Sequence, residues 1–480
     1  MNWVNFFSYQ ADRTLRTGFG YHSSRRAVQS TRTIFHASDR VPYQSAGKED
    51  VTNILLVNVH SSCNAGDAAL TLATLQQLRQ NFPGCCITLA MDDPDQPDPD
   101  VTVVPSLFAW VKSTDGDGSA RWRKPALFWL PFAALTPLFT RRIFHRAFFG
   151  LTPAALRPLL RAYLDADLIV SVPGGFLYSS GLGLTLAISV FILALAWLAG
   201  KPFYVFPQSM GPLARAWECR LLRWILGKAR VVMVREKASL DLLNRCRFTH
   251  PRLHLVPDTA FAFDGAPFAE AEAWLRSQGI DPEKDRPLMG LTAINWSAQN
   301  FNFTRQSEYE AACAGAARRF LEEHGGRIIL FPQVWGPTAA HDDRVPARRI
   351  AAQLAGLSNA VTMVEQPLPP TLLKSVYGRM DIFIGTRMHS NIFALSEGVP
   401  CLAIGYMHKT RGIAEMAGMG EWVLDIGDVT SGALTEKLEG LWQARQAVRQ
   451  ALRQILPSLA GQARQAGMLV SSDFQSLAGG

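Results

Sequence analysis

A short segment near residue 385 combines an arginine, a histidine and an expected helix start in a pattern suited to anion binding. The segment Asp381–Asn391 reads DIFIGTRMHSN, with Arg387 and His389 directly after an apolar run. We expect a strand, a tight turn and a helix whose free amides and dipole attract phosphate or carboxylate, with Arg387 adding a bidentate fork. The sequence therefore predicts an anion site. His389 is either a structural hydrogen-bond donor or a functional group, and its place beside Arg387 favours function.

Two more cations follow predicted strands. Arg235 comes directly after the apolar run 231–234, and Lys409 follows the predicted strand Cys401–Ile404. A charge buried at a strand end is costly unless it is paired, so Arg235 either binds Glu236 or another acid, or reaches an anionic ligand. Lys409 is either an ordinary surface lysine or a member of the same site, since the carboxyl ends of parallel strands share one edge of a sheet.

A polar loop, HSSCNAGD at residues 60–67, follows the first predicted strand and leads into a helix. Asp67 is the natural N-cap of that helix, because its carboxylate can accept free amide protons of the first turn. The functional alternative is that Asn64 and Asp67 contact sugar hydroxyls, with Asp67 as a general base.

These loops require a parallel sheet to bring them together. In the first half of the chain, buried strands and helices alternate; the elements are strand Asn53–Val59, helix Ala68 to about Asn81, strand Leu168–Val172, a turn at Pro173-Gly174-Gly175, an apolar helix, strand Phe203–Phe206, and strands near Val231–Val234 and His254–Val256. Such βαβ alternation is typical of a doubly wound sheet, in which ligands bind beyond the carboxyl ends of the strands.

A second alternation begins after the polar stretch 281–287. Its predicted elements are strand Leu288–Leu291, helix Glu308–His324, and strands Arg327–Leu330, Val361–Val364, Asp381–Ile384 and Cys401–Ile404. The motif F-P-Q-x-x-G-P occurs at Phe206 and again at Phe331, each time directly after a predicted strand, which suggests two related halves. The fold class is therefore α/β, with two Rossmann-like doubly wound domains.

The predicted division of the chain has four parts. They are a basic flexible arm at 1–50, an N-terminal Rossmann-like domain at 51–285, a C-terminal Rossmann-like domain at 286–430 that contains the predicted anion site, and a helical tail at 431–480. A chain of 480 residues with 48% apolar content can fill more than one core.

Charge and cysteine content limit the classes of function. The net charge of +8 is spread along the chain, and the basic residues lack interleaved aromatics in any nucleic-acid-binding module, so no nucleic-acid role is expected. Seven cysteines without a C-x-x-C pair predict no metal site and fit a reduced, cytoplasmic setting.

Three segments bear on membrane contact. The stretch from Met1 to about Lys48 is rich in Arg and Ser, which fits a disordered arm, a transit peptide or an amphipathic segment resting on a membrane. The run Leu182–Ala199 falls short of the ~20 residues of a span, so a buried helix is expected. The apolar stretch 126–139 contains two prolines between basic flanks and is suited to lie in a bilayer interface. Peripheral contact at the inner face of the cytoplasmic membrane is therefore a hypothesis.

At these motifs the sequence resembles the polysaccharide pyruvyltransferase family. The similar features are the N-x-G-D loop at Asn64, Pro173-Gly174-Gly175, P-Q-S-x-G-P from Pro207, Arg235-Glu236, Pro257-Asp258, and G-T-R-x-H-S-N from Gly385 with G-V-P-C-L-A-I-x-Y and Lys409 after it. They extend from about Val51 to Val423 and keep one order along the chain.

The resemblance implies a glycosyltransferase-B-like arrangement with the two domains facing a cleft. It also implies phosphoenolpyruvate as donor substrate, no cofactor or metal, and an acceptor sugar in a glycan or its lipid-linked precursor. The predicted catalytic residues are His389, Arg387 and Asp67; the predicted donor contacts are Arg235, Arg387, His389, Ser390, Asn391 and Lys409; the predicted acceptor contacts are Asn64, Asp67, Gly174, Gly175 and Gln208.

Two other functions stay open. A nucleotide-sugar glycosyltransferase could use the same architecture, with Glu397 as the only obvious carboxylate to hold a ribose. A non-catalytic glycan-binding scaffold is the other, although it would be expected to have lost Arg235, Arg387, His389 and Lys409.

Overall fold

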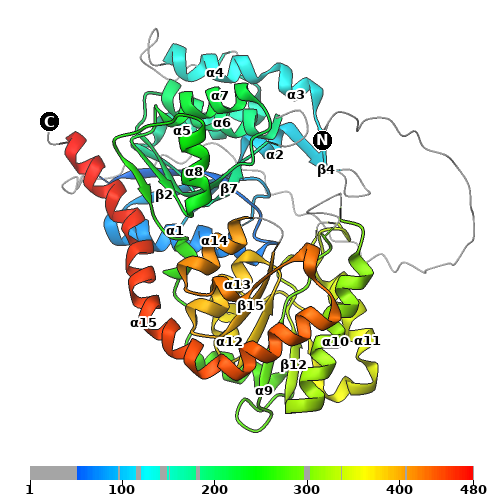
Figure 1. The fold of residues 1–480 in the computed structure, drawn as a ribbon. Helices are drawn as coiled ribbons and strands as arrows, with labels where there is room; N and C mark the ends of the chain where they lie inside the picture. Colours follow the sequence, from blue (N-terminus) through cyan, green and yellow to red (C-terminus); the bar gives the residue numbers. More distant parts are fainter. Residues whose placement is uncertain are drawn as a thin grey trace, which may run out of the picture. The chain divides into compact units, whose positions relative to one another are not determined.

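The computed structural model describes residues 51–95, 98–114, 120–140, 149–150, 152–179, 184–296, 303–336, 338–405 and 408–478. Residues 50–480 form one compact unit, shown in Figure 1. The predicted arm at 1–50 and the basic flank at 141–148 lie outside the described residues.

The first sheet has eight strands in the order β10-β9-β8-β6-β1-β2-β3, with β7 paired to β8. Its strands are β1 (Asn53–Val59), β2 (Cys86–Met91), β3 (Thr102–Pro105), β6 (Leu168–Ser171), β7 (Gly174–Leu177), β8 (Phe203–Met210), β9 (Val231–Val234) and β10 (Leu253–Leu255). All of its pairings are parallel. The turn predicted at Pro173-Gly174-Gly175 is wrong, because Gly174 pairs with Gln208 and begins a strand of its own.

Helices connect the strands of this sheet. They are α1 (Ala65–Asn81), α2 (Leu107–Val111), α3 (Lys124–Phe128), α4 (Leu130–Phe139), η2 (Ala154–Leu156), α5 (Arg157–Asp165), α6 (Leu184–Leu198), α7 (Ala216–Leu226) and α8 (Lys237–Arg245). A short antiparallel pair, β4 (Lys112–Thr114) and β5 (Ala120–Trp122), stands apart from the sheet. Among the helices of the described residues, none is long and apolar enough to cross a membrane. Helix α6 is largely buried, as predicted.

The second sheet has six parallel strands in the order β13-β12-β11-β14-β15-β16. They are β11 (Leu288–Leu291), β12 (Arg327–Leu330), β13 (Val361–Met363), β14 (Ile382–Gly385), β15 (Cys401–Gly405) and β16 (Val423–Asp425). The helical elements around it are η3 (Thr259–Phe261), α9 (Phe268–Ser277), α10 (Gln306–His324), α11 (Arg344–Gln353), η5 (Ala355–Ala360), α12 (Pro370–Tyr377), α13 (Met388–Ser396), α14 (His408–Met416), η6 (Gly420–Trp422) and η7 (Ile426–Asp428). Two doubly wound parallel sheets were the predicted fold class, and that prediction is confirmed.

Two apolar cores lie under the sheets, and they divide the chain less simply than the strands do. The predicted boundary at 285 separates the strands of the two sheets. However, η3 and α9 precede that boundary and pack in the core of the second sheet, as do Ala69 and Leu70 of α1. The proposed domain limits therefore describe the sheets better than the packing.

The long helix α15 (Ser431–Ala478) connects the two cores. Leu434, Leu438 and Leu441 are buried in the second core, whereas Ala466 and Val470 are buried in the first. In Figure 1 this helix, in red, runs past α12 and reaches α1. The predicted tail is thus a helix that belongs to both halves.

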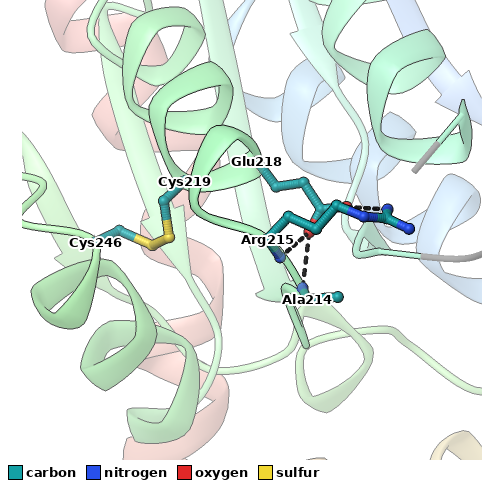
Figure 2. Close-up of a disulfide and its surroundings, with 5 residues drawn as sticks. All are labelled: Ala214, Arg215, Glu218, Cys219 and Cys246. Atoms are coloured by element: carbon teal, nitrogen blue, oxygen red, sulfur yellow. Dashed lines mark hydrogen bonds and ion pairs between the residues drawn. A yellow bond between two sulfur atoms is a disulfide. The ribbon is translucent and has the colours of Figure 1, made fainter. Parts of the chain in front are cut away.

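One cysteine pair corrects the expectation of reduced thiols. Cys219 of α7 and Cys246, which caps α8, form a disulfide with a Cα–Cα distance of 5.3 Å (Figure 2). That separation lies in the usual range for a disulfide. The pairing was not predictable from spacing, because the two cysteines are 27 residues apart and meet only when α7 packs beside α8.

Candidate active site

A cavity of about 250 Å³ lies where the carboxyl ends of strands from both sheets meet. Its lining residues are Asn64, Asp67, Gly174, Gly175, Arg235, Ile294, Trp296, Gln333, Thr386, Arg387, Met388, His389, Gly405, Lys409 and Thr410. The two halves touch beside it, because the amide of Ala65 donates to the Gln333 carbonyl at 3.0 Å. Eight of the predicted site residues therefore share one cavity.

Arg235 is held from behind by acids and a hydroxyl. Its side chain is 2% exposed, its Nη1 donates to Asp258 at 2.6 Å, and its Nε donates to Ser209 Oγ at 2.6 Å. Glu236 lies 3.6 Å from the same Nε. The first alternative raised for Arg235, pairing with acids, is confirmed. Its Nη2 lies near Gly175 at the cavity wall, and contact with an anionic ligand stays a prediction.

Lys409 converges on the same glycine. A Cβ placed on Gly175 would lie 2.9 Å from Lys409 Nζ and 3.6 Å from Arg235 Nη2. Burial, and next the charge of Arg235, lower the pKa of Lys409 to about 8. Among the described residues no carboxylate forms an ion pair with Lys409. Two cationic groups therefore lie close to a residue without a side chain, and all three residues line the cavity.

Arg387 is oriented by a carboxylate that the sequence analysis did not identify. Its Nη2 donates to Asp343 at 2.6 Å and its Nε donates to the same carboxyl at 3.0 Å, a bidentate pair. Asp343 is 1% exposed, and burial raises its pKa although Arg387 opposes that rise. The pair uses two of the three guanidinium nitrogens of Arg387. Among the described residues no hydrogen bond uses the third nitrogen, Nη1, so it is available to bind a ligand.

His389 lies in the first turn of α13, between α1 and Asp258. A Cβ on Gly66 would be 2.8 Å from the Cβ of His389, so the imidazole packs directly on that glycine. Its Nε2 is buried, lies 4.0 Å from Asp258, and has no hydrogen-bond partner in the described structure. Burial is the largest cause of a lowered pKa for His389, and Arg235 and Arg387 add to it. The ring is therefore neutral near pH 7 when no ligand is present.

The start of α1 differs from the prediction. Asn64, not Asp67, is the N-cap, and its Oδ1 accepts from the Gly66 amide at 3.0 Å. Asn64 Nδ2 in turn donates to Asp67 at 2.9 Å. The Asp67 carboxylate is thus held by Asn64 at the cavity wall, and its contact with an acceptor hydroxyl stays a prediction.

Three predicted contacts lie behind the cavity wall. Ser390 donates to the Arg387 carbonyl at 2.6 Å and lies 3.0 Å from the hydroxyl of Thr292. Asn391 packs under Gly385, and Gln208 donates to the Val172 carbonyl at 2.6 Å. None of the three lines the cavity, so a supporting role fits their positions better than ligand contact.

Comparison of the sequence with known protein families identifies the family. Residues 64–408 match the profile of the polysaccharide pyruvyl transferase family. The chain belongs to that family. This is the family that the motifs predicted, and the matched region contains every predicted site residue except Lys409, which follows it directly.

A curated relative has a related description. The chain is 24% identical over 251 residues to the amylovoran biosynthesis protein AmsJ of Erwinia amylovora, a match that covers 51% of this chain. The matched part spans 59% of AmsJ, which is less than two thirds of that protein's length.

Solved structures show the fold. The chain is similar to Anabaena Alr3699/HepE in complex with UDP-glucose, with a TM-score of 0.52 and 11% identity over 89% of this chain and 99% of that one. A putative UDP-N-acetylglucosamine 2-epimerase from Listeria monocytogenes has a TM-score of 0.51 and 12% identity over 87% of this chain and 94% of that one. At these identities the likeness concerns the two-domain glycosyltransferase-B-like architecture, as predicted.

Several residues that line the cavity were not predicted from the sequence. Ile294 and Trp296 follow β11, so the rule of examining residues after strands could have found them. Gln333 lies in the second F-P-Q-x-x-G-P motif, and its Nε2 is buried without a partner in the described structure. No sequence pattern indicated Asp343, because it takes part in the site through its ion pair with Arg387, which lies 44 residues further along the chain.

Proposed function

We propose that this enzyme transfers the pyruvyl group of phosphoenolpyruvate to two hydroxyls of one sugar, forming a cyclic ketal and releasing phosphate. The acceptor is an exopolysaccharide unit or its lipid-linked precursor. The observation that carries the proposal is the convergence of Arg235 Nη2 and Lys409 Nζ over Gly175, beside Arg387 and His389.

The charges of the cavity fit this donor. Phosphoenolpyruvate carries a carboxylate and a phosphate, and the lining provides three cations, Arg235, Arg387 and Lys409. Arg387 and Arg235 are each held by a buried acid, so the site needs little reorganisation when the anion binds. Asp67 is the only carboxylate among the described lining residues. We assign it to contact with an acceptor hydroxyl rather than with the anionic donor.

The proposed reaction has two additions to one carbon. His389, protonated when the donor is bound, gives its proton to the methylene carbon of phosphoenolpyruvate, and a sugar hydroxyl adds to the neighbouring carbon, which has become cationic. The carbon–oxygen bond to phosphate then breaks, and phosphate leaves with the bonding pair. A second hydroxyl of the same sugar adds to that carbon and closes the ketal. One hydroxyl proton restores His389 and the other leaves with phosphate, so atoms and charge balance.

A nucleotide-sugar glycosyltransferase is the second candidate, since the similar solved structures include complexes with UDP and UDP-glucose. Glu397, the carboxylate suggested to hold a ribose, does not line the cavity and instead lies 3.7 Å from Lys374. Its contact with Lys374 weakens this second reading.

Phosphate release tests the proposal. The enzyme is incubated with phosphoenolpyruvate and pooled cell-envelope glycans, and His389→Ala and Arg387→Ala are compared with the control Arg344→Ala, whose side chain pairs with Asp342 outside the cavity. We expect acceptor-dependent release that falls roughly hundredfold or more in both site variants and is retained in the control. Absence of release with every acceptor, together with binding of a UDP-sugar, would favour the glycosyltransferase.

A further inference from the structure

Exposed aromatic side chains are concentrated on one side of the first sheet. Among the described residues, the large exposed aromatics are Phe128, Trp129, Trp197, Trp217, Trp224 and Phe268. All except Phe268 belong to α3, α6, α7 or the junction between α3 and α4. Each of these five side chains is at least 38% exposed, although burial of such rings is strongly favourable.

The exposed face of α7 alternates tryptophan with basic residues. Trp217, Arg220, Trp224 and Lys228 are exposed and recur every three or four residues, so they lie on one side of the helix and its C-terminal extension. Trp224 packs edge-on against Trp197 of α6 at 5.8 Å, and Lys228 Nζ lies 5.6 Å from the Trp197 ring centre. The aromatic groups of two helices therefore form one continuous patch.

No exposed acid offsets the positive charge of this face. Between Ala216 and Lys228 the sequence contains a single acid, Glu218. Its side chain is fully buried and accepts hydrogen bonds from the Ala214 and Arg215 amides (Figure 2) and from the hydroxyl of Ser179. Arg220, Arg223 and Lys228 thus present an uncompensated cationic surface among the tryptophans.

Helix α4 extends the same side. Both α4 and α7 contact α6, and Figure 1 shows the three helices close together at the top of the view. Residues 130–139 contain no charged side chain, and the rings of Phe128, Trp129 and Phe132 cluster within 5.1–5.7 Å of one another. An apolar helix with an exposed aromatic end and the cationic helix α7 therefore both pack on α6.

We propose that this surface, made of Phe128, Trp129, Trp197, Trp217 and Trp224 with Arg220, Arg223 and Lys228, binds the surface of an anionic lipid bilayer. Tryptophan prefers the boundary between headgroups and acyl chains, and clustered arginine and lysine are attracted to anionic lipids. Binding is peripheral, because α6 is packed in the protein core.

Vesicle sedimentation with the full chain tests this proposal. Vesicles of equal parts phosphatidylglycerol and phosphatidylcholine are compared with pure phosphatidylcholine. The variants are the pair Trp217→Ala with Trp224→Ala and the pair Arg220→Glu with Lys228→Glu. The matched controls, on the other half of the chain, are Phe268→Ala, where the ring is 49% exposed, and Lys284→Glu, where the side chain is 85% exposed. Circular dichroism and thermal unfolding verify that each variant is folded.

We expect the native protein to bind the anionic vesicles, and each surface pair to weaken that binding about tenfold or more while the controls bind normally. More salt should weaken the binding of the native protein. Equal binding by the surface pairs and the native protein would overturn the proposal, and so would failure of the native protein to bind anionic vesicles. A change of oligomeric state in the lipid-free surface pairs would assign the patch to a second copy of the chain instead.

Discussion

The imidazole of His389 packs on the bare backbone of Gly66, so that a side chain at residue 66 and the observed position of His389 exclude one another. We expect Gly66→Ala to displace the ring and to lower transferase activity roughly hundredfold, because a displacement of about 1 Å is enough to disturb proton transfer. Gly461→Ala is the control, since a Cβ there meets nothing within 4 Å. Activity assays and circular dichroism check the result; full activity of Gly66→Ala would show that the position of His389 is not critical.

The lowered pKa of Lys409, about 8, predicts a pH limit on donor binding. Lys409 is cationic below that pH and becomes neutral above it, so the KM for phosphoenolpyruvate should rise as pH increases past about 8. Arginine stays charged throughout this range, and Lys409→Arg should therefore abolish the rise. The measurement is KM against pH for both proteins. Identical profiles would assign the pH dependence to another group.

Donor binding should bring a proton to His389. Burial and the nearby arginines lower its pKa, so the free ring is neutral at pH 7, and the negative charges of phosphoenolpyruvate favour its protonated form. Calorimetry at pH 7 in buffers of different ionisation enthalpy should reveal proton uptake on binding. His389→Gln should reduce that uptake, and unchanged uptake in the variant would place the proton elsewhere.

The buried pair of Arg387 and Asp343 predicts an unequal effect of two adjacent substitutions. Asp343→Asn leaves a buried guanidinium without its counter-charge and should cost about 3 kcal/mol of unfolding free energy, with weaker donor binding. Asp342→Asn is the control, because Asp342 pairs with the partly exposed Arg344 and should cost less than about 1 kcal/mol. Urea unfolding measures both. Equal losses would contradict the special role of Asp343.

The disulfide predicts a thiol count. The denatured, unreduced protein should react as five thiols, and the reduced protein as seven. Under non-reducing conditions Cys246→Ser should lower the unfolding free energy by about 3 kcal/mol, since the bond closes a loop between residues 27 apart. Cys63→Ser, at an exposed free cysteine, should have little effect. Seven reactive thiols before reduction would rule the bond out.

Predictions from sequence succeeded where one strand and its following loop determine a position. Arg235, Arg387 and Lys409 each come shortly after a strand, and parallel strands bring their carboxyl ends to one edge, so their meeting in the cavity follows from the order of elements. His389 could be placed by the same argument.

Other features depend on packing between distant segments, which no local pattern encodes. The pairing of Asp258 with Arg235 and of Asp343 with Arg387 requires knowledge of which side chains face each other across the sheet ends. Ser390 and Asn391 belong to the G-T-R-x-H-S-N motif, on which their predicted donor contact rests, but the turns of α13 direct them into the protein interior.

Helix α15 has a consequence for folding of the chain during its synthesis on the ribosome. Asp473, near its end, accepts hydrogen bonds from Tyr204 and Arg230, and the Ala463 carbonyl accepts one from Gln77. These partners belong to the half of the protein that is synthesised first. That half must therefore leave the ribosome with part of its surface uncovered until α15 has been synthesised. The half that is synthesised first therefore cannot complete its packing before the second half has been made. A nascent chain interrupted before α15 lacks contacts in both halves.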